Sequence, residues 1–368
     1  MSDALQKSLV LILLIALGYF LRSKFKSKEM VGGIKELVLT IALPATIFTA
    51  LMKIPLDRSL MIVPLITILF NIFIFYVIPP VLGFFTIDKD SPTGRSILML
   101  MPSLAPGLSA FPFIVEFLGQ KSLAMAAMAD VGNKVFVLIF LYIFALNLFL
   151  KQNKGQKSNL WSKIKSLLIS LVKEPINSII FVAIFLLSIG IGYDALPRLV
   201  TDIFDKTSAM MTPLILIFIG LAVELKQSKK RVIVSLLFFR AGVSVLFSAM
   251  VIMLFKISDP TQVLLALVIP LSSASFWPFA HISAFNLKED QLEIPKEKRT
   301  FNVEFAVLIL AFSLPFSSGL ILSILSMGKV FAHLGAIFAL GTVLILISVL
   351  PVLIAKLSVR FSNSMIKN

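Results

Sequence analysis

The amino-acid sequence predicts an all-α membrane protein that crosses the bilayer many times. Hydrophobic residues make up 58% of the 368 residues and charged residues only 14%, whereas a soluble protein carries about a quarter charged residues. Apolar runs of about twenty residues, the length that spans the hydrocarbon core as a helix, recur from one end of the chain to the other. Prolines interrupt two of these runs at corresponding places. These three observations predict a five-plus-five inverted-repeat transporter fold with crossed, broken fourth and ninth helices, plus one extra C-terminal span.

Eleven apolar runs are expected to be spans. They cover 8–21, 33–52, 59–87, 96–119, 122–150, 175–193, 203–223, 232–255, 261–286, 300–327 and 331–355. If the N-terminus is outside, the cytoplasmic loops hold 24 Lys and Arg residues and the outside segments hold 8. Because cytoplasmic loops carry an excess of basic residues, we expect the N-terminus outside and the C-terminus inside. Basic loops that face anionic lipid also explain the net charge of +15 without nucleic acid as a partner.

The spans divide the chain into two halves. The expected domains are a first repeat (1–150), a cytoplasmic amphipathic linker (151–173), a second repeat (174–327) and an additional span with a cytoplasmic tail (328–368). In the linker, apolar residues at helical spacing predict a helix on the membrane surface, with a flexible connector as the alternative. These residues are Leu160, Ile164, Leu167 and Leu171. The first apolar run has no charged leader or small-residue cleavage site before it, so we expect it to be a span.

Three landmarks recur in the same order in both halves. They pair Pro44 with Pro213 at an offset of 169 residues, Pro112 with Pro278 at 166, and Asn133 with Asn302 at 169. Five spans per half give the halves opposite orientations in the membrane. Broken helices at matching positions of two inverted halves mark the binding site of a secondary transporter.

The two interrupted runs, "LMPSLAPGLSAFPFIVEF" and "IPLSSASFWPFA", are the candidate binding region. Proline removes a backbone donor and breaks the helical turn before it, and lipid cannot satisfy the groups that are left free. Half-helix N-termini would direct N–H groups into a central cavity, and unwound carbonyls could bind a cation or a donor. The predicted substrate-binding residues are Gly107, Ser109, Phe111, Pro112, Asn133, Arg240, Ser272, Ser273, Ser275, Trp277, Pro278 and Asn302.

Ionisable residues inside spans are functional candidates because a mid-bilayer charge is costly. Asp130 and Lys134 lie one helical turn apart, either as a self-neutralising ion pair or as a carboxylate that takes a proton or cation with Lys134 as its gate. His281 is either a packing residue or a proton relay. Glu304 lies either near the interface or in the site. These four are the candidates for ion or proton coupling.

Arg240 lies nine residues into its span, which is about 13 Å deep at helical rise. A guanidinium suits bidentate binding of a carboxylate. Two interpretations stay open: Arg240 binds an anionic substrate, or it forms a buried pair with Asp130 or Glu304.

Three stretches carry a family resemblance. "LGYFLRSKFKSKEMVGGIKELVLTIALPATIFTAL", "FLGQKSLAMAAMADVGNKVFVLIF" and "EPINSIIFVAIFLLSIGI" resemble helices of the auxin efflux carrier family of permeases, within the bile/arsenite/riboflavin transporter superfamily. The resemblance covers residues 8–327 and implies ten helices, crossed helices four and nine, and transport of small organic anions. Two asparagines expected beside the breaks are replaced by Ala105 and Ala274, so the family's usual substrate is not carried over.

Several functions compete with an anion permease. A cation/proton antiporter would use an Asp in the fifth span, a bile-acid-type symporter would use sodium, and a receptor could keep the transporter fold. An enzyme is not expected, because the sequence has no HExxH or GxSxG motif, no cysteine, and only two histidines. No cofactor or metal is expected either. The expected partners are a small organic anion, the lipid bilayer, and sodium or a proton. A homodimer is one candidate assembly, and the expected location is the plasma (cytoplasmic or inner) membrane.

Overall fold

Helices form all the regular secondary structure in the part of the chain that the computed structural model describes, residues 3–25, 27–54, 58–152, 165, 169, 172–222 and 230–365. Seven helical runs in these residues are long and apolar enough to cross a membrane, and three shorter apolar helices accompany them. Each of the ten overlaps one predicted span. The remaining predicted span, 96–119, is divided into short helices. The structure is therefore that of an all-helical, polytopic membrane protein.

The helices follow one another along the chain with short connections. In the first half they are α1 (Asp3–Leu21), α2 (Lys28–Leu37), the π-helix η1 (Val38–Ala42), α3 (Leu43–Met52), α4 (Arg58–Leu82), α5 (Pro92–Leu100), α6 (Pro106–Ser109), α7 (Phe111–Val135), the π-helix η2 (Phe136–Phe140) and α8 (Leu141–Gln152). In the second half they are α10 (Pro175–Ser188), the 3₁₀ helix η3 (Tyr193–Ala195), α11 (Arg198–Ala209), α12 (Met211–Ala222), α13 (Lys230–Leu254), α14 (Pro260–Val268), the 3₁₀ helix η4 (Ile269–Leu271), α15 (Phe276–Gln291), the 3₁₀ helix η5 (Lys296–Lys298) and α16 (Val303–Ser326). The chain ends with α17 (Gly328–Phe331) and α18 (Leu334–Met365). The predicted interfacial helix with Leu160, Ile164, Leu167 and Leu171 lies outside the described residues.

Three helices begin with the same local signal. A polar side chain accepts a hydrogen bond from the backbone N–H three residues later, and a proline occupies the first helical position. The pairs are Ser91–Pro92 in α5, Glu174–Pro175 in α10 and Asp259–Pro260 in α14. The first turn of a helix has N–H groups without helical partners, so the cap satisfies one and the proline removes another.

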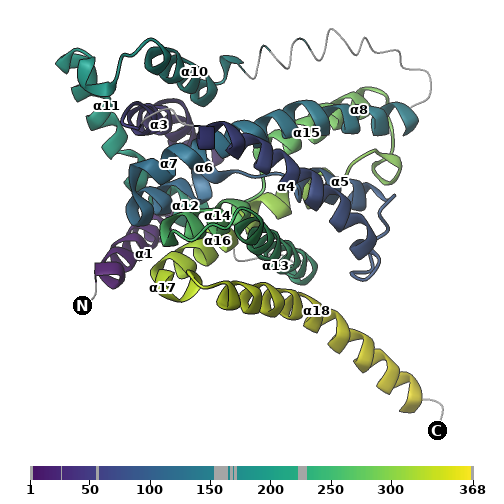
Figure 1. Ribbon diagram of the computed structural model, residues 1–368. Helices are drawn as coiled ribbons and strands as arrows, with labels where there is room; N and C mark the ends of the chain where they lie inside the picture. The colour runs from purple at the N-terminus through teal and green to yellow at the C-terminus, as the bar shows by residue number, and fades with distance from the viewer. Residues whose placement is uncertain are drawn as a thin grey trace.

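Contacts between helices divide the structure into two bundles (Figure 1). The small bundle consists of α1, α2, η1, α3, α10, α11 and α12. The large bundle consists of α4 to α8 and α13 to α16. Each bundle therefore takes helices from both halves of the chain. Their facing surfaces are formed by α1, α3 and α12 on one side and by α7 and α16 on the other.

Glycines permit the closest helix crossings inside each bundle. A Cβ atom placed on Gly18 of α1 would lie 2.1 Å from the carbonyl oxygen of Ile217 in α12. In the large bundle, a Cβ on Gly132 of α7 would lie 2.1 Å from the carbonyl oxygen of Pro64 in α4. Small residues let helix backbones approach where no hydrophobic effect drives association in lipid. These crossings fix the helices that position the broken segments.

The last long helix packs on the large bundle. Helix α18 runs along α13, and a Cβ on Gly242 would lie 2.8 Å from the carbonyl oxygen of Gly341. Helix α17 contacts α14 and α16. In Figure 1, α18 extends along the lower edge of the molecule, apart from the small bundle.

Candidate functional site

Two helices unwind inside the large bundle where the sequence places its prolines. Helix α5 ends at Leu100 and α6 begins at Pro106, which leaves residues 101–105 without helical structure. Helix α14 passes through η4, and residues 272–275 are extended before α15 begins at Phe276. Pro102, Pro106 and Pro270 lie at these interruptions. Each removes a backbone donor from a position where a continuous helix would need one.

The two unwound segments cross and hydrogen-bond directly to each other. The backbone N–H of Ala105 donates to the carbonyl oxygen of Ser273 over 2.8 Å. The hydroxyl of Ser109 accepts from the N–H of Ser273 at 2.9 Å, and the hydroxyl of Ser103 accepts from the N–H of Ser275 at 2.9 Å. All these serines are buried. The crossing thus satisfies its own backbone groups in a region where water is absent.

This arrangement corrects the expected role of the hydroxyls. Ser109, Ser273 and Ser275 were predicted to contact substrate, but they bond the backbone of the crossing. Ser272 also turns inward, because its hydroxyl donates to the carbonyl oxygen of Ile269 at 2.6 Å. Gly107 faces the small bundle, where a Cβ would lie 2.8 Å from the Leu43 side chain. The other buried residues beside the breaks, which start the two following helices, are Phe111, Pro112 and Pro278.

Arg240 of α13 binds the carbonyl oxygens of both unwound segments. Its Nε donates to Met101 at 2.7 Å, one terminal nitrogen to Ser103 at 2.8 Å, and the other to Ser272 at 2.8 Å. The residue is buried, with 3% of its surface exposed. No carboxylate of the described residues forms an ion pair with it. The predicted pair with Asp130 or Glu304 is therefore wrong, and all three bonded nitrogens are used by the protein itself.

Asn133 of α7 holds the first unwound segment at Leu104. Its side-chain oxygen accepts from the N–H of Leu104 at 2.9 Å, and its nitrogen donates to the carbonyl oxygen of Leu104 at 2.7 Å. The same amide donates to Asp130 at 3.1 Å and accepts from Asn71 of α4 at 3.2 Å. Asn133 thus replaces the helical partners that Leu104 loses at the break.

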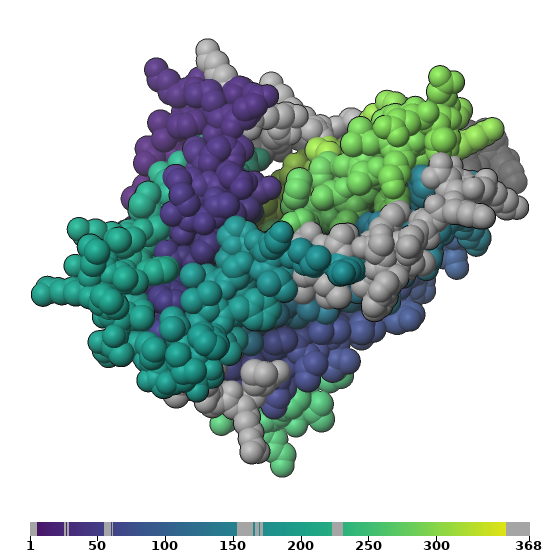
Figure 2. All heavy atoms as spheres, turned by 90° about the horizontal axis from the view of Figure 1, so that it is seen from above, coloured from purple at the N-terminus to yellow at the C-terminus, as the bar shows by residue number. Residues whose placement is uncertain are grey.

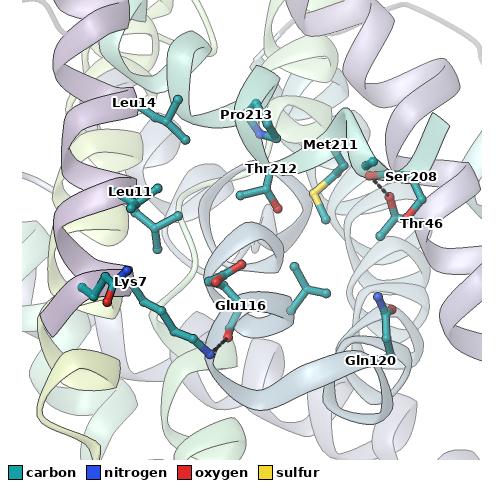
Figure 3. A pocket seen from close by; sticks show the side chains of 14 residues that line it. Lys7, Leu11, Leu14, Thr46, Glu116, Gln120, Ser208, Met211, Thr212 and Pro213 are labelled. Atoms are coloured by element: carbon teal, nitrogen blue, oxygen red, sulfur yellow. Dashed lines mark hydrogen bonds between the residues drawn. The ribbon is translucent and has the colours of Figure 1, made fainter. Parts of the chain in front are cut away.

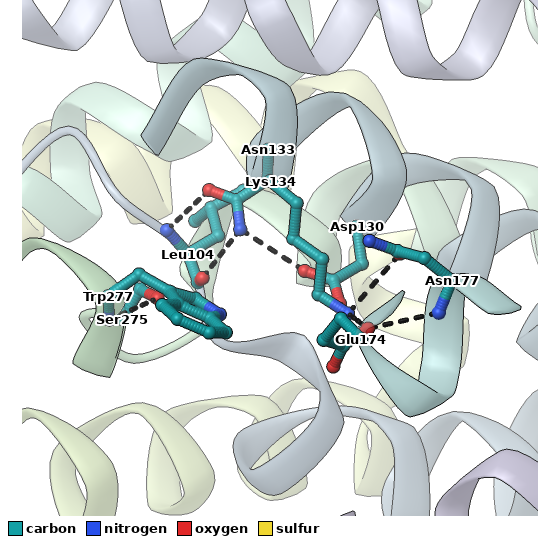
Figure 4. A network of polar contacts seen from close by, with 8 residues as sticks. All are labelled: Leu104, Asp130, Asn133, Lys134, Glu174, Asn177, Ser275 and Trp277. Atoms are coloured by element: carbon teal, nitrogen blue, oxygen red, sulfur yellow. Dashed lines mark hydrogen bonds and ion pairs between the residues drawn. The ribbon is translucent and has the colours of Figure 1, made fainter. Parts of the chain in front are cut away.

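Asp130 and Lys134 form the predicted one-turn ion pair, and the structure adds two partners from the small bundle (Figure 4). The Lys134 ammonium lies 3.2 Å from Asp130 and 2.8 Å from Glu174, the cap residue of α10. It also donates to Asn177 at 3.5 Å. Side chains of both bundles therefore meet at one buried lysine. In Figure 4, this cluster continues through Asn133 and Leu104 toward Trp277.

A cavity of about 540 Å³ lies between α1, α7 and α12 (Figure 3). Apolar side chains form one part of its lining, and Thr46, Glu116, Gln120 and Thr212 add polar groups. Lys7 of α1 crosses the cavity edge and donates to the carbonyl oxygen of Glu116 at 3.0 Å. Shortly after Glu116, helix α7 is interrupted at Gly119, whose φ of 80° suits glycine. The cavity lies at the contact between the two bundles.

A third lysine joins the bundles on another side. The ammonium of Lys35 in α2 lies 4.2 Å from the ring centroid of Phe276 in α15. Half of the Phe276 surface is exposed. Figure 2 shows the surface hollowed between the purple N-terminal segment and the green segment that contains α15. Lys7, Lys35 and Lys134 each connect one bundle to the other.

Three predicted residues lie away from the crossing. Asn302 caps α16, and its amide donates to Thr93 at 2.9 Å. Glu304 has 82% of its side chain exposed and pairs with Lys296 at 3.2 Å, so its predicted place in the site is wrong. His281 is buried against Tyr142, and its Nε2 lies 3.1 Å from the carbonyl oxygen of Val137.

The sequence did not identify several residues that build this region. Ser313 of α16 accepts from the N–H of Ala274 at 3.2 Å and serves the second break as Asn133 serves the first. It lies 180 residues after Asn133, so the predicted partner Asn302, at an offset of 169, is not its structural counterpart. Ser103 and Glu174 were also missed, although the Glu174–Pro175 pair is a recognisable helix start.

No family model matches this chain, and no curated protein sequence matches it. The fold and the crossing themselves define the class: a polytopic helical membrane protein in which two interrupted helices cross inside one bundle and lysines connect that bundle to a second one.

Proposed function

We propose that this chain is a secondary active transporter that carries a small organic anion across the membrane by alternating access. The observation that carries the proposal is the direct crossing of two broken helices, Ala105 to Ser273, within one of two bundles. Broken helices that meet near the midplane are the recurring binding element of secondary transporters, and rocking of one bundle against the other exposes the site alternately.

The proposed topology has eleven spans in a five-plus-five inverted arrangement, with the N-terminus outside and the C-terminus in the cytoplasm. The proline landmarks support it, because Pro44 and Pro213 lie at the starts of α3 and α12, and Pro112 and Pro278 lie at the starts of α7 and α15. The resemblance to the auxin efflux carrier family fits this topology and places the protein in the plasma (cytoplasmic or inner) membrane.

The proposed substrate path runs between the bundles rather than through the centre of the crossing. At the centre, the hydroxyls and Arg240 are already engaged with backbone groups. Between the bundles, the polar contacts described above are made by three lysines, Lys7, Lys35 and Lys134. Ammonium groups on both facing surfaces favour an anion over a cation, and contacts of this kind can break and re-form when the bundles move.

One observation favours a second function, a cation/proton antiporter. Lys134 is shared by two buried carboxylates, Asp130 and Glu174, so the cluster carries one negative charge in excess when all three groups are ionised. Such a cluster could exchange a proton for a cation. A sodium-coupled symporter and a receptor have no comparable observation in their favour.

Uptake into proteoliposomes tests the proposal. Labelled monocarboxylates and dicarboxylates with aliphatic or aromatic bodies are supplied under a proton gradient, a sodium gradient, or a membrane potential. We expect accumulation of at least one anion, and a loss of about tenfold or more in Lys134→Met. The matched control is Lys296→Met, which breaks an ion pair with 75% and 82% of its two side chains exposed and should keep its uptake. Cation–proton exchange without uptake of any anion would overturn the proposal in favour of the antiporter.

A further inference from the structure

The carbonyl ends of two half-helices converge on one positive charge. Met101 is the residue that ends α5, and Ser272 is the residue that ends η4. Their carbonyl oxygens, with that of Ser103, lie 2.7, 2.8 and 2.8 Å from the three nitrogens of the Arg240 guanidinium. Helix C-termini carry partial negative charge and leave carbonyls unbonded, so they attract a cation. Both interrupted helices present that end to the same point.

In transporters with broken helices, such carbonyls and C-terminal ends coordinate the coupling cation. Here the positive charge is covalently part of the chain. Arg240 has no carboxylate partner among the described residues, so the oxygen dipoles of the crossing balance its charge. With 3% exposure and three nitrogens hydrogen-bonded to carbonyl oxygens, it occupies the position that a dehydrated metal cation would need.

A second arginine shows what an ordinary buried arginine looks like in this chain. Arg95 at the start of α5 also donates to three backbone carbonyls, those of Asp90, Arg299 and Thr300. Burial lowers the pKa of Arg95, and the nearby carboxylates of Asp90, Glu289 and Asp88 act in the opposite direction. Arg95 joins loops outside the membrane and is compensated by acids. Arg240 has the same number of carbonyl partners but lies at the crossing, where only carbonyl oxygens bond it.

We propose that Arg240 is a resident cation that takes the place of a coupling metal ion at the crossing, so that the crossing binds no sodium. The occupancy of this position does not depend on what the protein transports. The consequence for coupling, that sodium binding at the crossing does not drive transport, rests on the transporter function proposed above.

The first test uses the unaltered protein. Thermal unfolding in detergent is compared in equal concentrations of NaCl, KCl and N-methyl-D-glucamine chloride. We expect midpoints that agree within about 1 °C, because a ligand stabilises only the state that binds it and none of these cations has a vacant position. A sodium-specific rise in the midpoint that saturates with concentration would overturn the proposal.

The second test removes the resident charge. Arg240→Ala leaves three buried carbonyls without a partner, so we expect the midpoint to fall by about 5–10 °C. Millimolar guanidinium chloride or NaCl should then raise it, and N-methyl-D-glucamine chloride should not. Arg95→Ala is the matched control: it loses the same three-carbonyl contact outside the crossing, and its midpoint should fall without becoming sodium-dependent. Failure of every small cation to stabilise Arg240→Ala would overturn the proposal.

Arg240→Lys keeps the test decisive if the alanine variant does not fold. Its ammonium retains the charge, so we expect a midpoint between those of the unaltered protein and Arg240→Met. Equal midpoints for the lysine and methionine variants would contradict a role for the charge. All these readouts are stabilities, so absence of anion uptake would overturn the proposed function and leave this inference standing.

Discussion

Replacing Asn133 tests whether side chains hold the unwound segment in place. Asn133→Leu keeps the approximate volume but removes both bonds to Leu104, at 2.9 and 2.7 Å. Leu104 is 1% exposed, so its N–H and C=O groups would be left unsatisfied and dry. Each such group costs about 1–3 kcal/mol, and we therefore expect a loss of about 2–6 kcal/mol in the free energy of unfolding.

The measurement is unfolding in mixed micelles at increasing SDS, with helix content followed by circular dichroism. Ser313→Ala is the matched control, because it removes one bond, at 3.2 Å, from the second break, and it should cost about 1–3 kcal/mol. If Asn133→Leu unfolds within about 0.5 kcal/mol of the unaltered protein, the range for a neutral surface change, then the amide does not support the break and the reasoning is refuted.

Three further predictions use the same preparations. Gly132→Ala should lower the free energy of unfolding by about 1–3 kcal/mol, because its Cβ would lie 2.1 Å from the Pro64 oxygen, whereas Gly83→Ala, with nothing within 4 Å, should be neutral; equal effects would contradict the close crossing. A double-mutant cycle of Lys134→Met and Glu174→Gln should give a coupling energy of about 0.5–3 kcal/mol, and a value of zero would show that the 2.8 Å contact contributes nothing to joining the bundles. Thr212→Trp should fill part of the 540 Å³ cavity and reduce anion uptake without lowering the unfolding midpoint; unchanged uptake would show that the substrate does not pass there.

The elements that local chemistry determines could be predicted from the sequence. Proline acts on the turn that precedes it, so the interruptions at residues 101–105 and 272–275 follow from the positions of Pro102, Pro106 and Pro270. The Asp130–Lys134 pair was also predictable, because residues four apart on a helix are neighbours.

The partners of Arg240 could not be predicted in the same way. Its three carbonyl oxygens come from two segments, which are 139 residues and 32 residues away along the chain. Only the crossing brings them together. The pairing of Asn133 with Asn302 failed for a related reason: a constant offset assumes loops of equal length, and the residue that performs the corresponding task is Ser313. Glu304 has a carboxylate in an apolar run, but α16 begins at Val303, which leaves this side chain at an exposed helix end.

The placement of the chain ends gives a direct way to watch the bundles. Helix α1 belongs to the small bundle, and α18 packs on α13 of the large bundle. The protein has no cysteine, so one cysteine introduced into each of these helices would carry a spectroscopic label without any background to remove. A pair of labels on α1 and α18 would then report the separation of the two bundles as a distance, in bilayers and during turnover, with neither probe placed in the crossing.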